Sequence, residues 1–129
     1  SFSLLPVEIF YRETGKSKKV TEYPCDGKLL KAAEQVKTKY HTGRGVIGSG
    51  DEWNNQLDRI ALLRERYHTA VEDMESAAAA QLCLSYGVPF LGVRILSNSI
   101  VNGEKFDEAV GIDGQKFMLS LIDQMREYM

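Results

Sequence analysis

The sequence contains few cysteines, histidines and prolines, and it has no long apolar run. Cysteine occurs 2 times, histidine 2 times and proline 3 times among 129 residues. Two widely separated cysteines do not form a metal-binding motif, and a buried free thiol at Cys83 is favoured over a disulfide with Cys25. No apolar stretch approaches the about 20 residues of a membrane-spanning helix. The sequence therefore indicates neither a metal centre nor a membrane partner, and the scarcity of cysteine favours the cytoplasm.

The chain also lacks an excess of either charge. It carries 16 basic and 18 acidic side chains, for a net charge of -2. A general attraction to nucleic acid or to an anionic membrane is therefore not indicated, and we interpret the lysines of 12–19 as a solvated turn. The first residues do not show a basic segment followed by an apolar one, so no secretory signal is expected. The apolar fraction of 43% is typical of one globular domain with a real core.

Apolar periodicity alternates between strand and helix along the chain. Strands are predicted over 2–11, at Val46 and Ile47, from Thr69 to Val71 and over 88–96. Helices are predicted over 28–40, 56–68, 76–87 and 115–128, with a polar loop of some helical character over 99–114. Asp26 is expected to cap the first helix, and Gly87 is expected to end the third. This order predicts an α/β layered domain with a mostly parallel sheet.

The segment 88–96 (VPFLGVRIL) is almost entirely apolar. This composition predicts a central strand that is covered on both faces. Arg94 is its one charge, and a buried charge without a partner is costly. We therefore expect Arg94 to have either a protein partner or a ligand.

Three acidic or sulfur-containing residues, Asp73, Met74 and Glu75, lie between a predicted strand and an alanine-rich helix. Carboxylates at such a turn can accept hydrogen bonds from the vicinal hydroxyls of a ribose, and the thioether offers an apolar contact for a sugar face. The alternative is that Asp73 or Glu75 only caps the helix and interacts with its positive dipole end. A metal site is less favoured, because His41 and His68 are interpreted as surface or turn residues.

A second polar set, Arg94, Ser97 and Asn98, follows the next predicted strand. Ligands of open α/β sheets bind outside the carboxyl ends of the strands, and the Asn98 amide suits a heterocycle edge. Alternatively, Asn98 only serves the turn after the strand. Trp53 follows a glycine-rich turn, where it stacks on an aromatic ligand or packs in the protein. The glycines of 48–51 indicate either a close backbone approach or a tight turn.

Three motifs together carry a family resemblance: GVIGSGDEWN (45–54), VEDMESAAAAQLC (71–83) and VPFLGVRILSN (88–98). They resemble the purine nucleosidase and nucleoside phosphorylase superfamily, and most closely its 5′-methylthioadenosine/S-adenosylhomocysteine nucleosidases. The resemblance implies a three-layer α/β/α sandwich around a mixed twisted sheet and a homodimer. It further implies cleavage of the N-glycosidic bond of a purine nucleoside, without a metal or an organic cofactor.

The resemblance also implies roles for individual residues. Glu75 matches the residue that binds the sugar hydroxyls, Met74 matches its neighbour in the ribose site, and Asp73 stands at an acidic position. On the base side, Trp53 matches an aromatic that stacks on the purine. Asn54 matches a position that touches the base edge, and Ser97 and Asn98 match the pair at purine N7. Phe106 lies in the loop that reaches toward the 5′-substituent pocket.

Asn98 departs from the pattern of the nucleosidases, which carry an aspartic acid at this position to protonate N7. An amide only hydrogen-bonds N7, and loss of a general acid typically costs about 10²–10⁴-fold. Three interpretations stay open. The chain is a phosphorylase for 6-oxopurine nucleosides, a slow nucleosidase, or a non-catalytic purine-binding relative of the storage type.

The chain is also shorter than members of the family. The family's N-terminal half carries the first strands and the carboxylate that positions the attacking water, and neither is recognisable here. We therefore interpret residues 1–129 as the C-terminal portion of a single domain, with a sheet that is incomplete alone. On this interpretation the chain's N-terminal half is a further partner, and the general base cannot be named from these residues.

Overall fold

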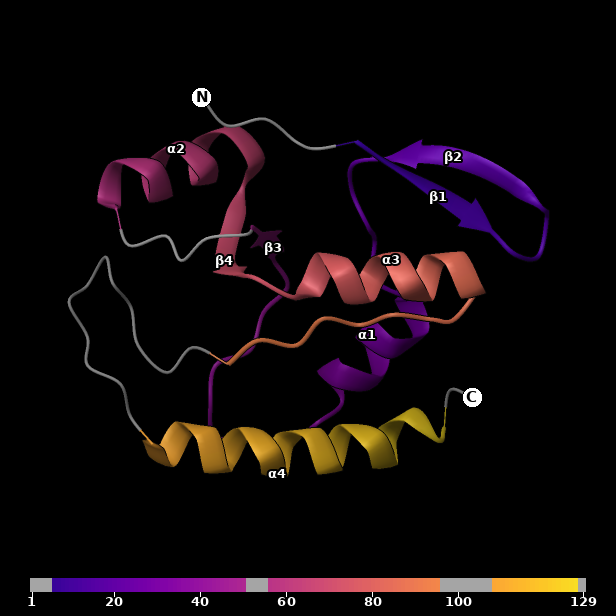
Figure 1. The fold of residues 1–129 in the computed structure, drawn as a ribbon. Coiled ribbons are helices and arrows are strands. Elements are labelled where there is room, and N and C mark those ends of the chain that lie inside the picture. Colours follow the sequence, from indigo (N-terminus) through magenta and orange to yellow (C-terminus); the bar gives the residue numbers. More distant parts are fainter. Residues whose placement is uncertain (1–5, 51–55, 96–107, 128–129) are drawn as a thin grey trace.

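The computed structural model describes residues 6–50, 56–95 and 108–127 (Figure 1). These residues form a mixed α/β fold. In chain order its elements are β1 Val7–Tyr11, β2 Lys16–Val20, α1 Gly27–Glu34, β3 Val46–Ser49, α2 Leu57–Tyr67, β4 Thr69–Asp73, α3 Ser76–Tyr86 and α4 Glu108–Met125. Within the described ranges the strands make two separate two-stranded sheets, β1–β2 and β3–β4. The prediction of one mostly parallel sheet is therefore wrong for this part of the chain.

Strands β1 and β2 form an antiparallel hairpin in which Val7 pairs with Val20 and Tyr11 with Lys16. Gly15 has a φ of 68°, a left-handed conformation that glycine adopts without steric cost. The predicted turn over 12–19 is too long, because residues 16–19 belong to strand β2, which pairs with the backbone of β1. The lysines of β2 are exposed as expected, and lysine is common on edge strands.

The second sheet is a parallel β–α–β unit in which β4 follows helix α2. Its register pairs Ile47 with Val71 and Ser49 with Asp73. A Cβ atom placed on Gly48 would lie 2.9 Å from Cγ2 of Thr69, so the glycine permits the close approach of the two strands. Of the two interpretations of the glycine-rich segment, Gly48 therefore fits close backbone approach.

The hydrophobic core joins α1 and the residue that follows it closely, Val36, to α4 and to the segment 88–95. Ala32, Val36 and Leu121 are its buried centre. Leu91 and Val93 pack against this centre, and Figure 1 shows their segment running between α3 and α4. Burial of these side chains ties the last part of the chain to the first helix.

Helix α1 begins as the sequence predicts. The Oδ1 atom of Asp26 accepts the backbone N–H groups of Lys28 at 2.9 Å and Leu29 at 3.0 Å, so the predicted cap is confirmed. The helix ends at Glu34, six residues before the predicted end at position 40. The residues beyond it include β-branched Val36 and Thr38, which have lower helix propensity.

The predicted central strand over 88–96 is wrong for residues 88–95. This segment has no strand assignment, and Val88 is 54% exposed. A strand needs a neighbouring backbone for its ladder. Instead, the Asp26 N–H group donates to the Phe90 carbonyl at 2.7 Å, and the Gly92 N–H group donates to Cys25 Sγ at 3.5 Å. The segment is held by isolated hydrogen bonds and by side-chain packing.

Helix α3 lies close to its predicted position, whereas α4 begins earlier than predicted. Gly87 ends α3 with a φ of 68°, which confirms the predicted glycine cap. Helix α4 begins at Glu108, inside the predicted loop. Phe117, Leu121 and Met125 belong to the core. Two further apolar residues of this helix, Met118 and Ile122, are 39% and 50% exposed.

A large share of the apolar surface is left uncovered by the described residues. Among them only six hydrophobic residues are buried, and several large apolar side chains on α3 and α4 are more than half exposed. Examples are Leu82, Tyr86, Ile112 and Leu119. None of the helices in the described ranges is long and apolar enough to cross a membrane. Exposed apolar area of this extent is typical of a surface that another protein segment covers.

Candidate functional site

The candidate site lies where β3 and β4 end and α3 begins. Because the two strands are parallel, their last residues, Ser49 and Asp73, lie side by side in the register. The Ser76 N–H group donates to Asp73 Oδ1 at 3.1 Å, and the Ala77 N–H group donates to Ser49 Oγ at 3.2 Å. Both strand ends thus satisfy N–H groups of the first helical turn, which have no partner inside the helix.

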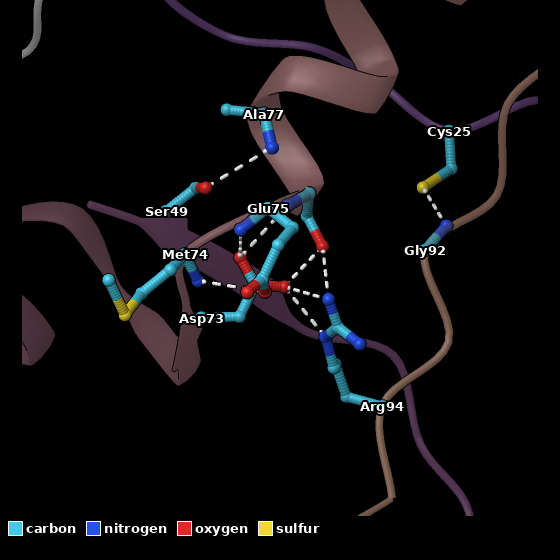
Figure 2. A network of polar contacts seen from close by, with 9 residues as sticks. Cys25, Ser49, Asp73, Met74, Glu75, Ala77, Gly92 and Arg94 are labelled. Atoms are coloured by element: carbon cyan, nitrogen blue, oxygen red, sulfur yellow. Dashed lines mark hydrogen bonds and ion pairs between the residues drawn. The ribbon is translucent and has the colours of Figure 1, made fainter. Parts of the chain in front are cut away.

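Asp73 is the centre of a hydrogen-bond network (Figure 2). Its Oδ1 atom accepts the N–H groups of Glu75 at 3.3 Å and Ser76 at 3.1 Å. Its Oδ2 atom accepts the Ser76 hydroxyl and the Arg94 guanidinium, with 2.6 Å to Arg94 Nε. The side chain is only 9% exposed. Of the two sequence interpretations, helix capping is the one that these contacts support for Asp73.

The network keeps Asp73 ionised. Burial raises the pKa of the Asp73 carboxyl. The hydrogen bonds from Ser76 and Arg94 and the charge of Arg94 lower this pKa, and together they outweigh the effect of burial. The net effect is a pKa below the ordinary value. A carboxylate that accepts several hydrogen bonds favours its charged form in this way. At neutral pH the pair is therefore a carboxylate and a guanidinium.

Arg94 crosses from the segment 88–95 to the start of α3. Its Nε atom donates to Asp73 and its Nη2 atom donates to Ser76 Oγ at 2.9 Å. The expectation that Arg94 has a partner is thus confirmed. The expectation that it is a buried charge is wrong, because its side chain is 40% exposed. Since 88–95 is not a covered strand, solvent reaches the guanidinium.

Met74 and Glu75 are oriented differently from Asp73. Both are exposed, Met74 by 45%. Glu75 precedes α3 without a side-chain capping hydrogen bond, and its Oε2 atom accepts the Met74 N–H group at 3.3 Å. The capping interpretation therefore does not apply to Glu75, and its carboxylate is open to a ligand.

A cleft of about 180 Å³ opens beside this network. Glu75, Ser76 and Ala79 line one side, and Phe90, Leu91, Gly92 and Arg94 line the other. The cleft combines a carboxylate, a guanidinium and an aromatic ring, which suits a ligand with hydroxyl groups and an apolar face. Ligand pockets commonly measure about 300–1,000 Å³, so this cleft is smaller than a typical ligand pocket.

A larger cleft of about 330 Å³ lies elsewhere, between residues 37–40, which follow α1, and helix α4. It is lined by Lys37, Lys39 and Lys116 together with Asp113. Lys39 is 3.5 Å from Asp113, which also accepts the Tyr40 hydroxyl. These contacts join the residues that follow α1 to α4, and none of the three sequence motifs contributes to this cleft.

The described ranges contain no group of three or more potential metal ligands. Cys25 and Cys83 are free and half-buried, so the free thiol is confirmed, but Cys83 is less buried than expected. His41 and His68 are exposed, and His68 ends α2 with a φ of 59°. The surface and turn interpretation of both histidines is confirmed.

The structure brings together Arg94, Asp73 and Glu75 with its neighbour Met74. Several other candidates lie outside the described residues: Trp53, Asn54, Ser97, Asn98 and Phe106. Sequence reasoning missed Ser76 and Ser49. Ser76 had a signal, since it stands three residues after Asp73 at a helix start. Ser49 had none, because it reaches α3 only through strand pairing.

Comparison with known proteins points to one family. A family model described as the phosphorylase superfamily matches residues 6–125. The 5′-methylthioadenosine/S-adenosylhomocysteine nucleosidase of Bacillus pumilus is 36% identical over 112 residues, covering 79% of this chain and 48% of the relative. The nucleosidase of the same name from Geobacillus kaustophilus is 30% identical over 114 residues, covering 81% and 48%. The chain spans about half the length of the curated relatives it matches.

Proposed function

Because this chain belongs to the phosphorylase superfamily, we propose that it cleaves the N-glycosidic bond of purine nucleosides. The proposed substrates are 5′-methylthioadenosine and S-adenosylhomocysteine, after the names of the relatives. Residues 1–129 are then the C-terminal portion of a single nucleosidase-like domain. The relatives' greater length supports this domain assignment, since this chain corresponds to 48% of two of them.

One observation carries the functional proposal: the contrast between the two carboxylates at the end of β4. Both Asp73 oxygens are occupied by protein donors, whereas Glu75 is exposed beside Met74 and lines the cleft with Arg94. A carboxylate can accept two vicinal hydroxyl groups at once, because it has two acceptor oxygens. Glu75 therefore binds the 2′- and 3′-hydroxyls of the ribose, and Met74 packs on the sugar.

The proposed reaction is a displacement at C1′ of the ribose through an oxocarbenium-like transition state. The C1′–N9 bond breaks, and the purine leaves with the electron pair. The oxygen of water bonds to C1′ and loses a proton, and the departing purine takes up one proton, so that the products are the free sugar and the neutral base. On the base side, the proposed roles rest on the resemblance. Trp53 stacks on the purine, Ser97 orients Asn98 at N7, and Asn54 and Phe106 contact the base edge and the 5′-substituent.

We further propose that the complete protein has a three-layer α/β/α sandwich and functions as a cytoplasmic homodimer. The uncovered apolar side chains of α3 and α4 support additional covering segments. The free cysteines agree with a reducing compartment. In such a sandwich, the segment 88–95 would gain the neighbouring strand that the described residues do not provide.

Asn98 favours a second candidate, a phosphate-dependent phosphorylase for 6-oxopurine nucleosides. In that reaction phosphate attacks C1′ and the asparagine amide hydrogen-bonds N7. A third candidate is a purine-binding protein without turnover. In all three candidates Glu75 contacts the sugar. They differ in whether water or phosphate attacks C1′, or neither, and in whether the contact of Asn98 with N7 assists release of the purine.

Purine release by the full-length natural protein distinguishes these candidates. Methylthioadenosine, adenosylhomocysteine, inosine and guanosine are each incubated with and without phosphate. Adenine release without phosphate from the first two supports the nucleosidase, and phosphate-dependent inosine cleavage supports the phosphorylase. Bound purine without release supports the binding protein. Failure to bind or cleave any of the four would overturn the proposed function.

A substitution at position 98 sharpens the same test. Asn98→Asp supplies a general acid, which typically contributes about 10²–10⁴-fold. For a slow nucleosidase we expect a strong increase in adenine release. If the substitution instead leaves a phosphate-dependent inosine activity unchanged, the argument about N7 is wrong.

A further inference from the structure

The oxygen atoms of Asp73 are already occupied by contacts among the described residues. Oδ1 accepts two backbone N–H groups at the start of α3, and Oδ2 accepts the Ser76 hydroxyl and the Arg94 guanidinium. A carboxylate offers about four acceptor positions. These four contacts therefore use the acceptor capacity of Asp73 within the protein.

The lining of the cleft agrees with this account. Glu75, Ser76 and Arg94 border the cleft, whereas Asp73 is not among the described residues that line it. Asp73 is 9% exposed, compared with 40% for the Arg94 side chain. Asp73 thus does not line the cleft itself but contacts two residues that do, Arg94 and Ser76.

Arg94 depends on this carboxylate for its orientation. Its Nε and Nη2 atoms donate to Asp73 and Ser76, and Figure 2 shows the remaining guanidinium nitrogen directed away from Asp73. The segment 88–95 is held by few backbone hydrogen bonds, so its own secondary structure does not fix the side chain. Two guanidinium donors on one carboxylate-centred network restrict its rotation.

We propose that Asp73 is a positioning residue that aims the remaining donors of Arg94 into the cleft, and that it does not bind the sugar. This inference rests on the proposed function of the same cleft. The two members of the acidic pair then have different roles, because Glu75 contacts the nucleoside whereas Asp73 acts through Arg94. Because Arg94 faces the cleft as a cation, the group it contacts is an electron-rich oxygen of the substrate or of the attacking nucleophile.

A double-mutant cycle on the full-length natural protein tests the inference. The variants are Asp73→Asn, Arg94→Ala and the combination, and the readout is kcat and KM for the best substrate found above. The Asp73→Asn variant keeps an oxygen for the α3 N–H groups but lacks the charge that holds Arg94. We expect the double variant to be no worse than Arg94→Ala alone, because contacting residues couple by about 2- to 150-fold. The Asp73→Asn loss should fall mainly on kcat if Arg94 contacts the nucleophile.

Asp26→Asn is the matched control, since Asp26 also caps a helix through two backbone N–H groups. It should leave kcat and KM unchanged. The ¹⁵N resonance of Arg94 Nε gives a readout that does not depend on turnover, and we expect faster Nε–H exchange in Asp73→Asn than in the wild type.

The outcomes separate the two claims. Losses that multiply in the double variant, or an unchanged Arg94 Nε–H exchange rate in Asp73→Asn, overturn the positioning role while the proposed function stands. A wild-type protein that neither binds nor cleaves nucleosides overturns the proposed function, and with it this inference. The Asp73–Arg94 pair would then have only a structural role, and faster Arg94 Nε–H exchange in Asp73→Asn would still show that Asp73 holds Arg94.

Discussion

The two small sheets of this protein use their polar residues in different ways. In the β1–β2 hairpin the strands are antiparallel, and the charged side chains of β2 stay in solvent. In the β3–β4 pair the strands are parallel, so Ser49 and Asp73 end at the same edge, where α3 begins. The parallel pair thus gathers polar groups at one place, whereas the hairpin disperses them along a surface. Parallel strand direction therefore explains why the polar groups gather at the end of β3 and β4.

The largest effect is expected from the exposed carboxylate of the parallel unit. Glu75→Gln should lower kcat/KM by about 10- to 150-fold, because a hydrogen bond to a charged group contributes about 1.5–3 kcal/mol. Glu8→Gln changes an exposed carboxylate of the hairpin and should leave nucleoside cleavage unchanged. Steady-state kinetics of both variants checks the comparison, and equal losses would contradict it.

Close strand packing is the second point at which the sheets differ. Gly48→Val would place a branched side chain where a Cβ atom already lies 2.9 Å from Thr69. We expect a loss of about 1–3 kcal/mol in the free energy of unfolding, as for other overpacked sites. Urea denaturation measures this loss. Gly43→Ala serves as control, because a Cβ atom there meets nothing within 4 Å.

A substitution in the turn of the hairpin should lower the stability of the protein without changing its activity. Gly15→Ala forces an alanine into a left-handed conformation with a φ of 68°, at a cost of about 1–2 kcal/mol. Thermal unfolding should show a lower midpoint. The kinetic constants should not change, and a loss of activity would mean that the hairpin takes part in the site.

The smallest effect concerns the dependence of stability on pH. The pKa of Asp73 is lowered in the folded protein, so its contribution is present above its unfolded pKa of about 3.9. It is lost as the pH falls through the lower folded value. Because Arg94 is 40% exposed, the pair contributes about 0–1 kcal/mol.

Urea titrations of the wild type and Asp73→Asn at several pH values test this sign. The stability difference should be present at neutral pH and should shrink as the solution is acidified below about pH 4. A difference that grows on acidification would contradict the lowered pKa. Asp26→Asn again controls for the capping role, which does not involve an arginine.

Sequence patterns predicted the helices better than the strands. Apolar spacing and end signals located α2, α3 and the start of α1, with Asp26 and Gly87 as caps. These signals are local, because a helix forms its hydrogen bonds within one segment. The segment 88–95 misled the prediction, since an apolar composition does not supply the neighbouring backbone that a strand needs.

The candidate site shows the same division. Their chemistry and their place at predicted strand ends identified Asp73, Glu75 and Arg94 as functional candidates. The order of three motifs identified the phosphorylase superfamily, which the family comparison supports over residues 6–125. Only the tertiary structure distinguished the two carboxylates. Asp73 accepts hydrogen bonds from Arg94 and Ser76, whereas Glu75 is exposed. Residue type sets which hydrogen bonds a side chain can make. Which of them it makes depends on partners that are distant in the sequence, and folding alone brings those partners within reach.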